Sequence, residues 1–241
     1  MRPTLLSLSL LVTAFAVLAL LNVLSPWDAA GQSPSAERFD YVVRDDFFAG
    51  LRGDTARLER AMKVCEELLA KNPKHAEALV WHGAALLLQA GQAFQRGEPD
   101  TARTLSSRGV SEMEAAVNMA PADPGVLVPR GAVLSAAARN VGVRDPERAK
   151  AFLSTAVGDY EKAVAAQTPS FPQMSEHARG ELLGGLADGW QRLGDENRAR
   201  GYLTRMVAEL PGSPYADAAK QWLAQKPMRG GPALTCVGCH E

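Results

Sequence analysis

Apolar residues recur at spacings of three and four from Thr55 to Lys71, and polar residues fill most positions between them. This spacing matches the period of an α-helix that buries one side and exposes the other. The apolar stripe consists of Leu58, Ala61, Met62, Cys65, Leu68 and Leu69. Sustained alternation of apolar and polar residues, which is typical of strands, is missing from the sequence. The pattern therefore predicts an all-α protein, with Cys65 as a small buried apolar residue.

Further helices are predicted between stretches rich in glycine, proline and aspartate. One runs from Ala76 to about Arg96, and the next begins near Pro99, because proline suits the first turn of a helix. A last amphipathic segment, from Ser213 to Gln225, is expected to cap the helical array. Its apolar stripe comprises Tyr215, Ala219, Trp222 and Leu223.

Composition and charge narrow the class of protein. The chain has 241 residues, of which 46% are hydrophobic, so it can bury a sizeable core. Its 26 basic and 27 acidic residues give a formal net charge of −1, which provides no long-range field to hold a polyanion. A nucleic-acid partner is therefore not expected.

Residues 180–213 resemble one unit of the tetratricopeptide repeat family. This unit consists of two antiparallel helices with small residues where they cross, at a spacing of about 34 residues. The matching residues are Leu183, Leu186, Ala187, Trp190, the turn from Leu193 to Asp195, Ala199, Leu203 and Pro211. Two longer upstream units carry Gly83 and Gly131 at matching positions. The resemblance covers residues 55–225 and implies an irregular α-solenoid of antiparallel helix pairs.

One departure from the family pattern concerns the third helix pair. Pro129 falls inside its first helix, where it removes a backbone hydrogen bond. We therefore expect this helix to be kinked or to begin late.

The family resemblance implies a concave groove that holds another protein. By the family's phasing, the groove is lined by Trp81, Ala84, Arg139, Asp188, Gln191 and Arg192. An alternative stays open, in which Trp81 is a core residue and the charged residues are ordinary surface. The helical segments contain no G-x-S-x-G, P-loop or H-E-x-x-H motif, so we expect a binding protein rather than an enzyme.

The first residues have the features of an export segment. Arg2 precedes an uncharged apolar run from Leu5 to Leu24, Pro26 then breaks the helix, and small residues follow up to Gly31. The run is close to the length of about 20 residues that spans a bilayer. Two outcomes stay open, namely cleavage after Gly31 and retention as an anchor in the inner membrane. Either one predicts a protein exported to the periplasm.

The chain ends with Cys236, Cys239 and His240 in the spacing C-x-x-C-H. This spacing is the attachment signature of c-type haem, in which two thiols bind the porphyrin covalently and the histidine ligates the iron. Three alternatives stay open: a redox-active thiol pair, a zinc site, and a relic motif without cofactor. The second iron ligand is expected to be water, a residue such as Met228 or His82, or a group from a partner protein.

These patterns divide the chain into four parts. They are a signal peptide or membrane anchor (1–31), a linker with a first helix (32–54), the helical repeat domain (55–225) and a flexible tail with the C-x-x-C-H motif (226–241). Together they predict an exported scaffold that binds a protein partner in its groove and carries haem c on its tail. The alternative function is an electron-transfer subunit, a c-type cytochrome that uses the repeats as a docking platform.

Overall fold

A computed structural model describes residues 38–225 of the chain, and within this range every regular element is helical. The elements are α2 (Phe39–Leu51), α3 (Thr55–Lys71), α4 (Ala76–Gln95), α5 (Pro99–Met119), α6 (Pro124–Val141), α7 (Pro146–Gln167), the 3₁₀ helix η1 (Phe171–Gln173), α8 (Glu176–Arg192), α9 (Glu196–Glu209) and α10 (Pro214–Leu223). The predicted all-α fold class is therefore confirmed for the described residues.

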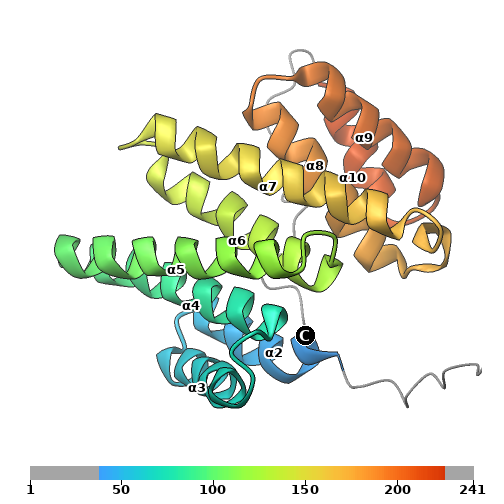
Figure 1. The fold of residues 1–241 in the computed structure, drawn as a ribbon. Coiled ribbons are helices and arrows are strands. Elements are labelled where there is room, and N and C mark those ends of the chain that lie inside the picture. The colour runs from blue at the N-terminus through green and yellow to red at the C-terminus, as the bar shows by residue number, and fades with distance from the viewer. Residues whose placement is uncertain (1–37, 226–241) are drawn as a thin grey trace, which may run out of the picture. The chain divides into compact units, whose positions relative to one another are not determined.

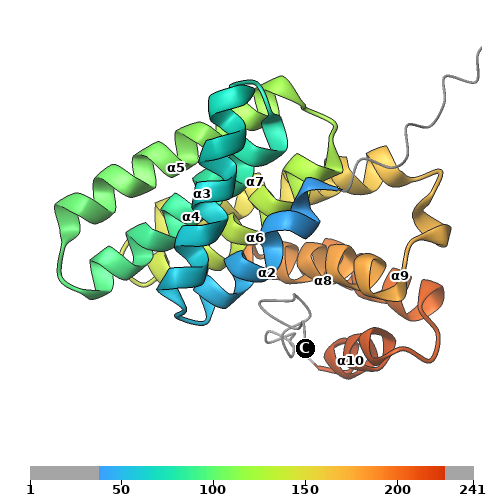
Figure 2. The ribbon, with the colours of Figure 1, turned by 90° about the horizontal axis from the view of Figure 1, so that it is seen from below.

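The helices pack as adjacent pairs (Figure 1). The pairs are α2 with α3, α4 with α5, α6 with α7, and α8 with α9, while α10 packs on α9. The first helices α2, α4, α6 and α8 also contact one another in succession, and we call them the first-helix layer. In Figure 2, α4, α6 and α8 can be followed side by side. This packing of successive helix pairs is consistent with a helical repeat.

Local sequence signals explain where the helices begin. Asp54, Asp145, Asp195 and Ser213 each accept a hydrogen bond from a backbone N–H in the first turn of the helix that follows. Such caps satisfy donors that would otherwise lack a partner. Proline occupies the first turn of α5, α6, α7 and α10, where its missing N–H has no cost. The predicted bounds of α3 are confirmed, and those of α4 and α10 differ by at most two residues.

Helices within a pair approach closely because small residues lie at their crossings. A Cβ atom added at Gly83 would lie 2.6 Å from the carbonyl oxygen of Gly109, and one added at Gly109 would lie 2.6 Å from that of Gly83. The backbones of α4 and α5 are thus in direct contact. Ala187 and Ala199, the predicted small residues of the last pair, are both fully buried.

Pro129 does not delay its helix. α6 begins at Pro124 and continues through Pro129 to Val141, so the expectation of a late start is wrong. Asp123 caps this helix, and Pro124 stands in its first turn, so the start signal lies upstream of Pro129. The helix therefore continues past the one backbone donor that Pro129 lacks.

Cys65, which the apolar stripe of α3 predicts to be buried, lies in the core. Cys65 is 1% exposed, and burial, helped by the nearby Glu66 carboxylate, raises the pKa of its thiol to about 12. It is thus a protonated core residue at neutral pH.

No helix within residues 38–225 is long and apolar enough to cross a membrane, and the uncharged run from Leu5 to Leu24 lies outside this range.

Substitution of a crossing glycine tests this packing. Gly109→Ala is expected to destabilise the protein by about 1–3 kcal/mol, because the new methyl group must push α4 and α5 apart. The matched control is Gly158→Ala on α7, where a Cβ atom meets nothing within 4 Å. Since alanine favours helix by up to about 1 kcal/mol over glycine, the control should not destabilise. Urea unfolding compares the two, and equal midpoints would contradict the proposed crossing.

Candidate functional site

The structure brings three of the predicted groove residues together in one ionic cluster between α6 and α8. Arg139 Nη2 donates to Asp188 Oδ2 at 2.6 Å, and Arg192 Nη1 lies 3.3 Å from the same oxygen. Arg192 Nη1 also lies 3.2 Å from both the carbonyl oxygen and the Oγ of Ser135 on α6. Arg139 stands in the last turn of α6, and Asp188 and Arg192 are one turn apart on α8.

The cluster connects α6 and α8, which contact each other less than the other neighbouring first helices do. α6 packs more closely on α4 than on α8, so long side chains are needed to connect α6 with α8. Tyr160 of α7 helps to set this spacing, because its ring lies against Gly131 on one side and Gly185 on the other. A Cβ atom added at either glycine would come within 2.9 Å of the ring. The two glycines therefore create the slot that holds the tyrosine.

The cluster joins a buried anion to a cation that reaches solvent. Asp188 is 8% exposed, whereas the side chain of Arg139 is 47% exposed. Burial and the neighbouring Arg139 lower the pKa of Arg192, and the attraction of Asp188 opposes this shift. Arginine stays charged in proteins, so the three side chains carry a net charge of about +1. The cluster thus presents one positioned guanidinium group at the surface.

Tyr160 stays protonated beneath this cluster. Burial is the main cause that raises the pKa of its phenol, and the carboxylates of Glu181, Asp188 and Asp159 raise it further. Its hydroxyl group is therefore a neutral part of the core and not a base.

The other predicted groove residues lie elsewhere or contribute less. Trp81 and Ala84 are 7% and 1% exposed, and Trp81 packs edge-on against Phe47 of α2 with ring centroids 5.1 Å apart. They form core between α2 and α4 and offer almost no surface to a partner. Gln191 is half-buried beside Arg192 on α8. The sequence left the core role of Trp81 open, and the structure assigns it that role.

His82, named as a possible second haem ligand, is enclosed by three helices. Its side chain is 3% exposed, and Nδ1 lies 2.5 Å from Glu112 Oε2 of α5. On the other side, Nε2 lies 3.4 Å from Glu66 Oε1 of α3. Burial would raise the pKa of Glu112, but hydrogen bonds from His82 and Arg108 outweigh it and lower this pKa. His82 therefore connects α3, α4 and α5.

A second buried ion pair, between Arg130 and Asp159, was not predicted from the sequence. Arg130 of α6 donates through Nε and Nη2 to both carboxylate oxygens of Asp159 on α7, each at 2.6 Å. The two side chains are only 10% and 2% exposed. Neither residue stands in a motif, and only the neighbouring Gly131 marks the crossing, so the sequence held no signal for this pair.

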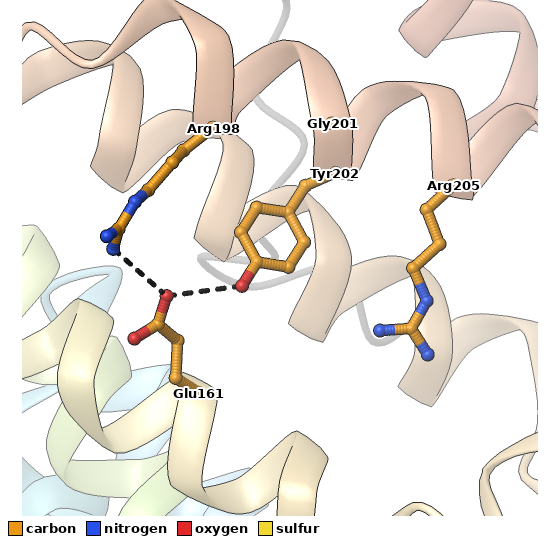
Figure 3. Close-up of a pocket in the computed structure, with 5 residues that line it drawn as sticks. All are labelled: Glu161, Arg198, Gly201, Tyr202 and Arg205. Atoms are coloured by element: carbon orange, nitrogen blue, oxygen red, sulfur yellow. Dashed lines mark hydrogen bonds and ion pairs between the residues drawn. The ribbon is translucent and has the colours of Figure 1, made fainter.

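A shallow hollow of about 420 Å³ lies on the opposite side of the helix pairs, between α7 and α9 (Figure 3). Glu161 accepts hydrogen bonds there from Tyr202 at 3.2 Å and from Trp190 at 3.1 Å, and Arg198 lies 3.8 Å away. Partial burial and Glu161 raise the pKa of Tyr202. The charged groups are thus already paired within the protein. The lining residues are Glu161, Arg198, Gly201, Tyr202 and Arg205.

The haem-motif residues Cys236, Cys239 and His240 lie outside the described residues, as does Met228. Among residues 38–225, no group of three or more His, Cys, Asp or Glu side chains is arranged to hold a metal ion. The cofactor therefore remains a prediction that rests on the sequence.

Removal of Asp188 tests whether the cluster supports the fold. Asp188→Ala should destabilise the protein by about 1–3 kcal/mol, because it leaves the partly buried Arg192 without its anion. Arg139→Ala should cost less than about 1 kcal/mol, since that side chain is half-exposed. The matched control is Asp217→Ala, which breaks an exposed pair with Lys220. If Asp188→Ala and Asp217→Ala unfold at the same urea concentration, the cluster has no structural role.

Comparisons of the chain with protein-family models, with curated proteins and with solved structures gave no match. Function is therefore inferred from the residues of this chain.

Proposed function

We propose that this protein is an exported scaffold that binds another protein on its first-helix layer and carries covalent c-type haem on its C-terminal tail. The observation that supports partner binding most directly is the cluster of Arg139, Asp188 and Arg192. A buried carboxylate holds a guanidinium group in place while leaving it half-exposed. Binding groups that are fixed in advance lose less conformational entropy when a partner arrives.

The layer itself fits a protein-binding role. We propose that residues 55–225 are a tetratricopeptide-like array, and that α2 extends it at the N-terminal side. The pairwise packing supports this, and so does the complete burial of Leu183, Leu186 and Leu203, which stand at the family's apolar positions. In stacked helix pairs, each unit adds one first helix to a common binding surface.

The haem part of the proposal rests on the C-x-x-C-H spacing and on the export segment. Cys236 and Cys239 would hold the porphyrin through thioether bonds, and His240 would ligate the iron. When bound, haem supplies an iron centre that can accept and donate one electron. Because Glu112 holds the buried His82, the second axial ligand would come from water, Met228 or a partner.

Site-specific photocrosslinking tests the proposed binding face. A photoreactive amino acid at the exposed Ala132 of α6 reports on the first-helix layer, and the matched control is the exposed Ser154 of α7. Both side chains are exposed, so either substitution should leave the fold intact. When the protein is crosslinked in the envelope of the cells that naturally produce it, we expect an adduct with another protein from position 132 and none from position 154. Adducts from position 154 alone would place the partner on the second helices and contradict the proposal.

The second candidate function is an electron-transfer subunit for which the helices are only a docking platform. The C-x-x-C-H motif favours it, and intact-mass spectrometry of protein made with export and haem-maturation machinery decides whether haem is present. We expect a chain heavier by one haem, and loss or weakening of this covalent attachment in Cys236→Ser. An unmodified chain with both tail thiols free to alkylate would exclude both the haem and the electron-transfer function. The same spectrum shows whether the chain is cut after Gly31.

A further inference from the structure

Exposed apolar side chains lie beside arginines at the C-terminal ends of α4 and α6. Phe94, near the end of α4, is 43% exposed, and the guanidinium carbon of Arg144 lies 4.4 Å from the centroid of its ring. Val143, in the turn after α6, is 91% exposed. The turns that follow α4 and α6 lie at the same end of the helix pairs, on the left in Figure 1.

The turn after α6 adjoins the helix end that carries Arg139 of the ionic cluster. The N–H of Arg144 donates to the carbonyl oxygen of Val141 at 2.9 Å, so the turn stays attached to the last turn of α6. Arg139 stands in that last turn and pairs with Asp188 of α8. We call the surface formed by Phe94, Arg139, Val143, Arg144 and Arg192 the arginine edge. It crosses three helices of the first-helix layer.

The arginine edge carries an excess of positive charge. It contains three guanidinium groups, and two of them share the carboxylate of Asp188. Within residues 38–225, no carboxylate lies within ion-pair distance of Arg144, which stacks on Phe94 instead.

The acidic residues near the arginine edge do not form ion pairs with its arginines, apart from Asp188. Asp145 caps α7 through the N–H of Arg148, and Glu98 pairs with Arg96. Glu147 is exposed in the first turn of α7. None of these three carboxylates forms an ion pair with Arg139 or Arg144, so both guanidinium groups can pair with an incoming anion.

Arginine and apolar surface together select a particular kind of ligand. A guanidinium group binds a carboxylate through two parallel hydrogen bonds, and Arg139 and Arg144 are both exposed enough to do so. Covering Phe94 and Val143 with an apolar side chain is favourable because it removes apolar area of both partners from water. A ligand with carboxylates alone would leave this area in water.

We infer that the arginine edge binds an acidic segment of the partner protein, in which an apolar side chain stands between carboxylates. The carboxylates pair with Arg139 and Arg144, and the apolar side chain packs on Phe94 and Val143. This inference rests on the proposed partner-binding function and names the chemistry of that partner.

Fluorescence anisotropy with the full chain tests this chemistry. The probe is a labelled peptide of repeated Glu-Glu-Leu triplets, and the reference peptides repeat Lys-Lys-Leu and Glu-Glu-Ser. We expect the chain to bind the first peptide most tightly and to lose affinity as salt is added. No measurable binding of the Glu-Glu-Leu peptide, equal binding of the Lys-Lys-Leu peptide, or tighter binding of a single-stranded oligonucleotide would overturn the inference.

Substitutions of single arginines test which residues bind the Glu-Glu-Leu peptide. Arg144→Glu should weaken the Glu-Glu-Leu complex by about tenfold or more, and it should fold normally because Arg144 takes part in no ion pair within the described residues. Arg139→Ala should weaken it less, because it removes one positive charge, whereas Arg144→Glu also adds a carboxylate that repels the peptide. The matched control for Arg139→Ala is Arg103→Ala on α5, whose exposed side chain pairs with Asp100 one turn away. An equal loss of affinity in Arg103→Ala would overturn the inference.

Crosslinking from position 132 separates this inference from the proposed function. If the partner adduct forms in the parent and is lost in Arg144→Glu, the inference is supported. If the adduct persists in Arg144→Glu, the partner binds the first-helix layer without using the arginine edge, and only the inference fails. If the parent itself gives no adduct from position 132, the proposed function fails as well.

Discussion

The placement of Tyr160 between two glycines is the constraint on which the candidate site depends. Because Gly131 and Gly185 have no side chain, the ring fits between α6 and α8 and fixes the distance between these helices. A β-carbon at either position would collide with the ring. α6 contacts α8 less extensively than it contacts α4, and Arg139 connects α6 to α8 through Asp188. The ionic cluster therefore follows from the packing beneath it.

This arrangement also explains why one carboxylate serves two arginines. Asp188 is nearly buried, and a buried anion is costly unless it is paired and hydrogen-bonded. Arg192 approaches from the same helix and also bonds to Ser135, while Arg139 arrives from α6 and stays half-exposed. Arg192 therefore serves mainly the fold, whereas Arg139 faces solvent, where we propose that it meets a partner. By contrast, the charges of the hollow between α7 and α9 are paired internally.

Sequence patterns predicted the helices well because their signals are local. The three-to-four spacing of apolar residues and the flanking stretches rich in glycine and proline predicted the bounds of α3 and nearly those of α4 and α10. The candidate site was predictable only in part. Family phasing selected Arg139, Asp188 and Arg192, which do meet, but it also selected Trp81, which is buried against Phe47 of a helix outside the predicted repeats. The pair of Arg130 and Asp159 depends on which faces meet across a crossing, and no local signal encodes that.

Hydrogen–deuterium exchange of the full chain, with and without the Glu-Glu-Leu peptide, tests most directly whether partners bind the first-helix layer. Val143 and Arg144, in the turn after α6, are exposed residues, so amide exchange in this turn reports on contact with the arginine edge. We predict slower exchange there and in the last turn of α8 when the peptide is bound. Slower exchange confined to α7 and α9, around Glu161 and Tyr202, would contradict this account.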